Sequence, residues 1–172
     1  MPVFVIAPLN LQPADAEALA LMRNSYDPNA AVVGPHVTMV FGLDDGLEGE
    51  AQRWARIHAA AFAAFALRFT LATVARDYEN SAWYLFLMPK QIPPGLAELH
   101  RRLNSGALAG APDVAFDAHL TLGRFRERVL AEAVARDTNG AARVVDARIE
   151  TLEVLLFDGT AVRNRTVLPL GG

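Results

Sequence analysis

The sequence contains no cysteine in its 172 residues. It can therefore form no disulfide, no cysteine nucleophile and no cysteine-ligated metal site. No apolar run is long enough to span a bilayer. Residues 1–4 also lack the basic region and cleavage site of a signal peptide. Together these absences predict a cytoplasmic protein.

An excess of positive charge is missing as well. The chain has 16 basic and 19 acidic side chains, a net charge of −3 and a pI near 5.8. Proteins that coat long nucleic acid usually carry a basic face, so this charge balance argues against that class. If the ligand is a nucleic acid, the charge favours a small nucleotide or the end of an RNA.

The signatures of several enzyme classes do not occur in the sequence. The G-x-S-x-G motif of many serine hydrolases is absent, and the few serines fall in predicted turns. Neither a P-loop nor a G-x-G-x-x-G motif is present, so ATP- or NAD-dependent chemistry has no support. No H-E-x-x-H motif or close set of three ligands suggests zinc. We therefore expect no cofactor and no metal.

Histidine is scarce too, with only four residues, yet two of them head the same short pattern. Residues 35–41 read P-H-V-T-M-V-F, and residues 118–124 read A-H-L-T-L-G-R. Both read apolar, then His-x-Thr, then apolar again. The copies are separated by nearly half of the chain, which indicates a duplicated lobe.

The repeated pattern predicts a polar pair on one face of each of two strands. Residues i and i+2 of a strand point to the same face, so His36 would lie beside Thr38, and His119 beside Thr121. Two imidazoles facing each other across a cleft suit acid–base catalysis near neutral pH. The two hydroxyls could hydrogen-bond the reacting group and stabilise the charge that develops on it. These four side chains are the predicted catalytic residues.

At these residues the chain resembles the 2H phosphoesterase superfamily, which includes bacterial 2′-5′ RNA ligases and 2′,3′-cyclic nucleotide phosphodiesterases. Members carry two His-x-Thr/Ser-x motifs, one in each lobe of a pseudo-symmetric α+β fold. The order of elements matches over nearly the whole chain. One departure is Ala118, where the family often has proline before the second histidine. The resemblance is specific for the superfamily but says little about the substrate.

Arg124 is a predicted substrate-binding residue because, in the resembled ligase branch, an arginine at this offset contacts substrate phosphate. Strict alternation would place it on the face opposite His119, but a bulge at Gly123 could return it to the same face. The alternative is a surface arginine or one paired with an acidic side chain. The other two histidines, His58 and His100, lie at the edges of predicted apolar helix stripes, and we expect them to be packing or surface residues.

Periodicity and turn signals predict mixed helices and strands. In chain order we expect strand 3–7, helix 13–23, the first histidine strand, helix 50–64, strands 65–71 and 82–88, a helix opened by Pro93 and Pro94, the second histidine strand, helix 127–137, strand 147–157, a turn at 158–159 and strand 166–170. The expected apolar faces comprise Trp54, Ile57 and Ala61; Phe65, Leu67, Phe69 and Leu71; Leu96, Leu99 and Leu103; and Leu130 and Val134. Residues 84, 86 and 88 should share the face opposite 83, 85 and 87.

This order predicts an α+β fold of antiparallel sheets. The repeat and the resemblance add two pseudo-symmetric lobes, with helices on the outer faces and a cleft between the lobes. We expect residues 1–172 to form a single domain of two intertwined lobes, acting as a monomer without a membrane partner.

The resemblance implies a metal-independent phosphoesterase acting on a 2′,3′-cyclic phosphate or a 2′-5′ phosphodiester of a nucleotide or RNA end. Reverse 2′-5′ ligation is compatible with the same residues. The alternative is a module that binds a nucleotide or an RNA end in the same cleft without turnover. The presence of two proton-transfer groups favours the enzyme, since a pure binder does not need them.

Overall fold

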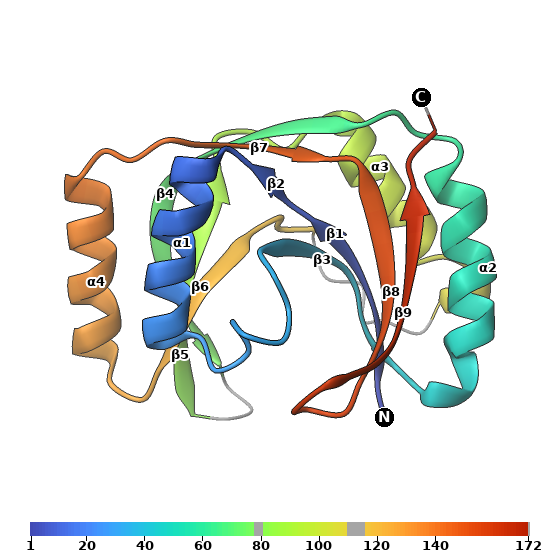
Figure 1. Ribbon diagram of the computed structural model, residues 1–172, viewed down its shortest axis with the longest axis horizontal. Coiled ribbons are helices and arrows are strands. Elements are labelled where there is room, and N and C mark those ends of the chain that lie inside the picture. Colours follow the sequence, from blue (N-terminus) through green and yellow to red (C-terminus); the bar gives the residue numbers. More distant parts are fainter. Residues whose placement is uncertain (78–80, 110–115, 172) are drawn as a thin grey trace.

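The computed structural model describes residues 1–77, 81–109 and 116–171, and shows an α+β fold with two antiparallel sheets (Figure 1). The helices in these ranges are α1 (Pro13–Tyr26), α2 (Glu48–Ala59), α3 (Pro94–Leu103) and α4 (Arg128–Gly140), with short 3-10 turns at Asp45–Leu47 and Gly106–Leu108. The strands are β1 (Val3–Pro8), β2 (Asn10–Leu11), β3 (His36–Leu43), β4 (Phe65–Asp77), β5 (Ala82–Pro89), β6 (Leu120–Phe125), β7 (Val145–Ile149), β8 (Thr151–Phe157) and β9 (Val162–Pro169).

Each predicted histidine strand lies at the edge of a different sheet. The first sheet has the order β3-β1-β8-β9 and the second the order β2-β7-β4-β5-β6. The edge strands β3 and β6 contact each other, so the two sheets meet at the strands that carry the motifs. The predicted fold class is confirmed.

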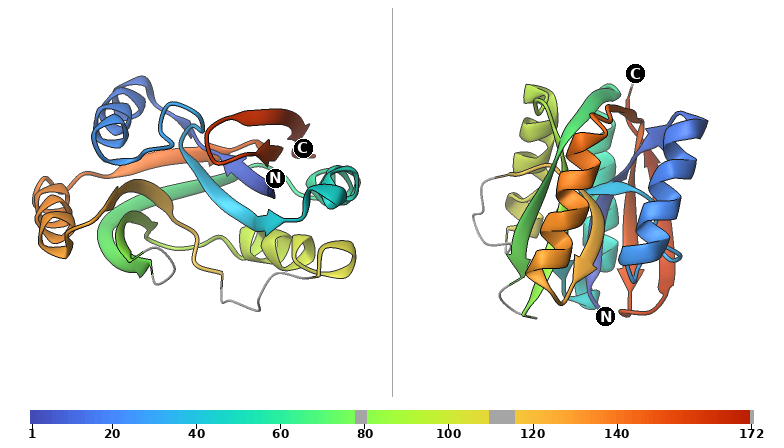
Figure 2. Two further views of the ribbon diagram at one scale, coloured as in Figure 1. Left: turned by 90° about the horizontal axis from the view of Figure 1, so that it is seen from below. Right: turned by 90° about the vertical axis from the view of Figure 1, so that its left-hand side faces the viewer.

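The helices lie at the two ends of the molecule, outside the sheets. Helices α1 and α4 pack on the second sheet at one end, and α2 and α3 pack on the first sheet at the other (Figures 1 and 2). Each sheet therefore buries one face under helices. In the first sheet Ile6 and Leu155 are also buried, in a second cluster with Val33 from the segment before β3. No helix among the described residues is both long and apolar enough to cross a membrane.

The helix faces were predicted with mixed success. The stripe of α3 is confirmed, because Leu96, Leu99 and Leu103 are fully buried. In α2 and α4 the predicted stripes are confirmed at Trp54 and Val134, which pack against the core. They are wrong at Ile57 and Leu130, which are exposed while alanines are buried instead. The buried residues of these two helices are Ala51, Ala55, Ala59, Ala131 and Ala135. Alanines four residues apart form an apolar stripe that lets a helix backbone approach a sheet closely.

Strand β4 runs further than predicted and changes face along its length. Its pairing with β5 shifts register between Phe69 and Leu71, which marks a β-bulge. Phe69 is fully buried, whereas Leu71 is 51% exposed on the opposite face. The prediction that Phe65, Leu67, Phe69 and Leu71 share one face is therefore wrong at Leu71. Simple alternation of side chains does not anticipate the extra residue that a bulge inserts.

The predicted strand 147–157 is two strands that belong to different sheets. Strand β7 pairs with β4 in the second sheet, and β8 pairs with β1 and β9 in the first. Glu150 separates them, and its carboxylate accepts hydrogen bonds from Asn10 and Arg148. The chain crosses between sheets at this polar residue, within a run whose apolar pattern is almost continuous.

Candidate active site

The two histidine strands bury one face and present the other, as their alternation predicts. In β3 Val37 and Met39 are fully buried, whereas His36 and Thr38 are half-buried. The second copy behaves in the same way. Leu120 and Leu122 are buried, while His119 and Thr121 stay partly exposed. No hydrogen bond joins either threonine hydroxyl to another described residue, so both remain available to a ligand.

Both strands bulge directly after the threonine. The pairing of β3 with β1 shifts register between Thr38 and Val40. The pairing of β6 with β5 shifts between Thr121 and Gly123. The extra residue is the third after the histidine in each motif, Met39 in one copy and Leu122 in the other. The repeat thus extends from the sequence to a local irregularity of the backbone.

The bulge in β6 decides where Arg124 lies. After the bulge, Arg124 is opposite Tyr84, and before it Thr121 is opposite Phe86. Tyr84 and Phe86 are two residues apart on β5 and so share a face. Arg124 therefore lies on the same face as Thr121 and as His119, whose ring contacts Phe86.

Each imidazole is held by the backbone two residues before it. Nδ1 of His36 lies 2.8 Å from the carbonyl oxygen of Gly34, and Nδ1 of His119 lies 2.7 Å from that of Asp117. A carbonyl oxygen can only accept, so both Nδ1 atoms must carry the proton. In the neutral rings the unshared pair is consequently on Nε2, on the side away from the backbone.

The two imidazoles lie within electrostatic reach of each other. Burial is the main cause that lowers the pKa of both His36 and His119 below its ordinary value. Arg23 and the other imidazole lower the pKa of His36 further, while the hydrogen bond to Gly34 and the carboxylate of Asp27 oppose them. The structure therefore brings together two histidines that are far apart in the chain, in an environment that favours their neutral forms.

A buried ion pair on α1 closes one side of this region. The guanidinium of Arg23, only 3% exposed, donates to Asp27 at 2.6 Å and to the carbonyl oxygen of Val33 at 2.9 Å. These contacts tie the end of α1 to the segment that leads into β3. Neither charged residue was predicted to belong to the site, and their i, i+4 spacing was the one available signal.

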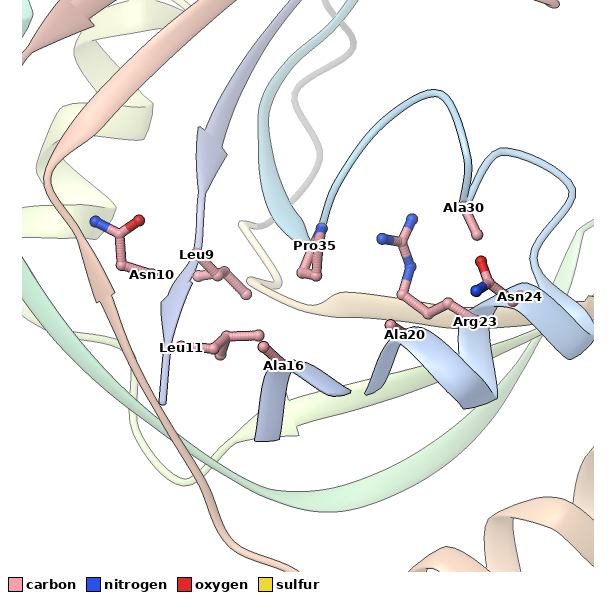
Figure 3. A pocket seen from close by; sticks show the side chains of 9 residues that line it. All are labelled: Leu9, Asn10, Leu11, Ala16, Ala20, Arg23, Asn24, Ala30 and Pro35. Carbon is pink, nitrogen blue, oxygen red and sulfur yellow. The ribbon is translucent and has the colours of Figure 1, made fainter. Parts of the chain in front are cut away.

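A pocket of about 290 Å³ lies beside the first motif, where Pro35 forms part of its wall (Figure 3). Arg23 and Asn24 from α1 and Asn10 from β2 add polar groups to a largely apolar lining. The remaining lining residues are Leu9, Leu11, Ala16, Ala20 and Ala30. The pocket borders the first histidine strand on the side where α1 and β2 approach it.

A row of aromatic and charged groups connects His119 with Arg124. The rings of His119 and Phe86 are 3.9 Å apart, and those of Phe86 and Tyr84 are stacked at 5.4 Å. The guanidinium carbon of Arg124 lies 5.7 Å from the Tyr84 ring, and its Nη2 donates to Asp77 at 3.2 Å. Asp77 was not predicted to belong to the site, because the residues next to it in the sequence form no motif that indicates a functional role.

Arg124 thus combines the two roles that the sequence left open. It pairs with an acidic side chain, and it also lies on the face of His119. Its Nε forms no hydrogen bond within the described part of the chain, so Asp77 does not saturate the guanidinium. Burial is the main cause that raises the pKa of the neighbouring Tyr84 phenol, which stays neutral.

The other two histidines lie in packing positions, as predicted. His58 packs edge-on against Trp54, with ring centroids 4.6 Å apart. His100 stacks on Phe116 at 4.1 Å. Across residues 1–77, 81–109 and 116–171, no three histidine, aspartate or glutamate side chains gather in a way that could hold a metal ion.

The family model described as the 2′-5′ RNA ligase superfamily matches residues 8–161 of the chain. A Geobacillus thermodenitrificans protein named "Putative phosphoesterase" is 29% identical over 103 residues, and a Geobacillus kaustophilus protein of similar name is 27% identical over the same length. The match covers 59% of this chain and 58% of each relative, so the chain spans little more than half of their length.

Solved structures share the fold over nearly the whole chain. Escherichia coli LigT in its apo form is 18% identical with a TM-score of 0.55, covering 98% of this chain and 97% of LigT. Kluyveromyces marxianus Usb1 with uridine monophosphate is 11% identical with a TM-score of 0.62, covering 98% of each chain. A crystal structure titled phosphoesterase is 19% identical with a TM-score of 0.55, also covering 98% of each chain.

Proposed function

Because the chain belongs to the 2′-5′ RNA ligase superfamily, we propose that it is a 2H-type phosphoesterase that uses His36 and His119 as its acid–base pair. Its substrate would be a 2′,3′-cyclic phosphate or a 2′-5′ phosphodiester of a nucleotide or RNA end. The same groups could catalyse 2′-5′ ligation in the reverse direction. Reaction would require no metal ion.

The observation that carries this proposal is the matched anchoring of the two imidazoles. Each Nδ1 donates to the carbonyl oxygen two residues upstream, so each Nε2 is free for proton transfer. His36 begins β3 and His119 directly precedes β6, the edge strands of the two sheets, and the two rings interact electrostatically. This arrangement supports an in-line reaction, which needs its base and its acid on opposite sides of one phosphate.

The proposed hydrolysis of a cyclic phosphate proceeds in one displacement. One Nε2 takes a proton from water while the water oxygen bonds to phosphorus. The bond from phosphorus to one ribose oxygen breaks, and the protonated Nε2 of the other histidine gives that oxygen its proton. The phosphate keeps its charge of −1 until the new phosphomonoester ionises in solution. Either histidine can be the base, and the roles exchange in ligation.

The threonines and Arg124 would stabilise the phosphate during this displacement. The hydroxyls of Thr38 and Thr121 belong to the same strand faces as the two histidines and have no partners among the described residues. Their donors can follow the non-bridging oxygens as charge develops. Arg124 adds a positive charge on the face of His119, where its incompletely paired guanidinium can contact the phosphate.

The nucleotide character of the substrate is supported by structures of the same fold. Escherichia coli LigT has been crystallised with 3′-AMP, and Kluyveromyces marxianus Usb1 with uridine monophosphate. Those ligands are a nucleoside phosphate in each case. By analogy, we propose that this chain takes a small nucleotide or the terminus of an RNA.

The test is turnover of a panel of 2′,3′-cyclic nucleotides and 2′-5′-linked dinucleotides by the purified protein. His36→Ala and His119→Ala should each lower kcat about 10²- to 10⁴-fold, as expected for a lost general acid or base. Thr38→Ala and Thr121→Ala should cost on the order of 10- to 10³-fold.

His58→Ala is the matched control, because this histidine packs against Trp54 on α2 and should leave the rate unchanged. Circular dichroism of each variant would verify that the fold persists. Near-normal rates for both His36→Ala and His119→Ala on a turned-over substrate would disprove the mechanism. Tight binding of the panel without any turnover by the wild type would favour a non-catalytic nucleotide-binding module.

A further inference from the structure

The last turn of helix α3 contacts both histidine motifs, although it belongs to neither of them. Leu96, Leu99 and Leu103 are fully buried and anchor the helix in the core. Asn104 is the C-cap of the helix, and His100 lies one turn before it. Because the apolar stripe fixes the helix, the side chains on this turn can hold neighbouring segments in place.

The first of these contacts holds the bulge of the first motif. Nδ2 of Asn104 donates to the carbonyl oxygen of Met39 at 2.7 Å. Met39 is the extra residue that the register shift places between Thr38 and Val40, and its side chain is fully buried. The extra residue of a bulge is left out of the strand ladder, and a backbone carbonyl in such a place needs another donor. Asn104 supplies that donor from a different element.

The amide of Asn104 is fixed in orientation by two carbonyl groups. Its Nδ2 also donates to the carbonyl oxygen of His100 at 2.8 Å. Both partners can only accept, so both hydrogens of the amide nitrogen are used and the amide cannot be reversed. One bond ties the amide to its own helix turn, and the other ties that turn to β3. The bulge beside Thr38 is therefore held from the helix side as well as by the pairing of β3 with β1.

The second contact reaches the segment before the second motif. The ring of His100 stacks on that of Phe116, with centroids 4.1 Å apart and planes inclined by 17°. Phe116 immediately precedes Asp117, whose carbonyl oxygen accepts a hydrogen bond from Nδ1 of His119 at 2.7 Å. The same helix turn thus holds a backbone carbonyl next to Thr38 and packs against the segment that anchors His119.

We propose that Asn104 is a positioning residue for the reaction, which through the carbonyl of Met39 fixes the direction of the Thr38 hydroxyl, while His100 steadies the segment that carries His119. The inference rests on the phosphoesterase function proposed above and adds a supporting helix turn to it. Asn104 acts through the backbone of β3 and not by contact with the substrate. A bulge determines where neighbouring side chains point, and a shift of about 1 Å in a group that contacts the reacting phosphate can lower the rate about 10²-fold.

Asn104→Ser separates the two bonds of the amide. A serine hydroxyl can still donate to the carbonyl four residues before it in a helix, but it is one bond shorter than the amide and does not reach Met39. We expect kcat on uridine 2′,3′-cyclic phosphate to fall about 10-fold, with KM within about 2-fold of the wild type, because the Thr38 hydroxyl acts as charge develops. Asn104→Asp keeps the shape of the side chain, removes both donors and should lower kcat at least as much.

A double-mutant cycle tests whether Asn104 acts through Thr38. In a Thr38→Ala background the hydroxyl is absent, so Asn104→Ser should lower kcat by no more than about 2-fold. In a Thr121→Ala background it should still lower kcat about 10-fold, because that hydroxyl belongs to the other strand. Equal losses in both backgrounds would overturn the proposal, as would an unchanged kcat in Asn104→Ser alone.

Asn139→Ser is the matched control, because Asn139 in the last turn of α4 also bonds a strand beside a bulge. Its Nδ2 donates to the carbonyl oxygen of Ala72 at 2.9 Å, and its Oδ1 accepts from the N–H of Ala72 at 2.7 Å. The change should lower the midpoint of urea denaturation at least as much as Asn104→Ser does, and leave kcat within about 2-fold of the wild type. An equal loss of kcat in the two variants would assign the effect to stability and overturn the positioning role.

His100→Ala and His100→Phe test the second contact. Removal of the stack on Phe116 should lower kcat several-fold, because the segment before His119 loses its packing partner. His100→Phe keeps a ring against Phe116 and should restore most of that rate. An unchanged kcat in His100→Ala, or an equal loss in both variants, would overturn the role of the stack.

If the wild type turns over no cyclic phosphate, the phosphoesterase proposal fails and Asn104 is judged by the geometry of the first motif alone. Nuclear magnetic resonance of protein labelled at its threonine methyl groups reports on Thr38 and Thr121 separately. Asn104→Ser should shift the Thr38 resonance and leave that of Thr121 unchanged, and Asn139→Ser should shift neither. An unchanged Thr38 resonance in Asn104→Ser would refute the hold on Met39.

Discussion

The protonation of His36 and His119 controls the proposed chemistry at the scale of single residues. One ring must be neutral and the other protonated at the same time, which produces a bell-shaped dependence of rate on pH. Because the rings interact, both limbs belong to the pair and not to either histidine alone. Burial lowers the pKa of both rings, so both are mainly neutral at pH 7 and the protonated partner is the scarce form.

We expect kcat/KM to be greatest below pH 6.5 and to fall as pH rises through neutrality. The descending limb reports loss of the proton from the acid, whose pKa is lowered in the free protein. Bound substrate brings a negative phosphate that favours imidazolium, so the optimum of kcat should lie at higher pH than that of kcat/KM.

Initial rates on a cyclic nucleotide from pH 4.5 to 8.5 would check this shift, with circular dichroism at each pH as the control for folding. An optimum of kcat/KM well above pH 7 would contradict the lowered pKa values. It would also indicate that a third group, unrelated to the two histidines, supplies the acid.

At the scale of elements, the paired bulges of β3 and β6 shape the site. A bulge twists its strand and changes which residues share a face. In β6 this brings Arg124 onto the face of Thr121, and it sets Gly123 against the last turn of α1. A Cβ added at Gly123 would lie 2.6 Å from Cβ of Tyr26 and 3.0 Å from Cε2 of Phe125.

Gly123→Ala should therefore push the end of α1 away from β6. We expect a loss of about 1–3 kcal/mol in the free energy of unfolding, typical of overpacking. Activity should fall as well, because Arg23 in the last turn of α1 and Asp27 at its C-cap act on His36. Urea denaturation followed by circular dichroism would measure the stability change.

Gly46→Ala provides the comparison, since an added Cβ at Gly46 meets nothing within 4 Å. It should leave the free energy of unfolding within about 0.5 kcal/mol of the wild type, as for surface substitutions. An unchanged midpoint in Gly123→Ala would mean that α1 can shift without cost and does not position the ion pair.

At the scale of the whole molecule, sheet pairing brings the two histidines together. The first sheet joins strands from both ends of the chain, since β1 lies between β3 and β8. Strands β3 and β6 then meet at the edges of the two sheets. The site consequently depends on the complete fold, and neither half of the chain contains both proton-transfer groups.

This architecture also predicts that catalysis survives removal of metal ions. The described ranges bring no set of three suitable side chains together, and the proposed proton transfers use the imidazoles alone. Exhaustive EDTA treatment should leave the rate on a cyclic nucleotide unchanged. Loss of activity that Zn²⁺, Mg²⁺ or Mn²⁺ restores would replace the two-histidine mechanism with a metal-dependent one.

Much of the local structure could be read from the sequence. The alternation around His36 and His119 predicted which side chains are buried, and the stripe of Leu96, Leu99 and Leu103 predicted the buried face of α3. The strand of Tyr84 and Phe86 was predicted with its two faces correct. These features depend on a period of 2 or 3.6 residues, which short sequence windows record directly.

The predictions failed where packing against another strand or sheet decides which side chains are buried. Leu71 changes face because of a bulge against β5, and Glu150 divides an apolar run between two sheets. Ile57 and Leu130 are exposed because small alanines face the sheets. A single sequence window carries no record of the strand or sheet on the other side of these contacts.

The sequence by itself determined the chemical groups of the candidate site and their arrangement within each motif, because i, i+2 alternation is a local property of a strand. Only the tertiary structure decided that the two motifs meet, that Arg124 lies on the same sheet face as His119, and that Asp77 and the Arg23–Asp27 pair lie beside them. Those relations arise from sheet pairing, bulges and helix packing between residues distant in the chain. Their energies depend on contacts that form only when the whole chain has folded.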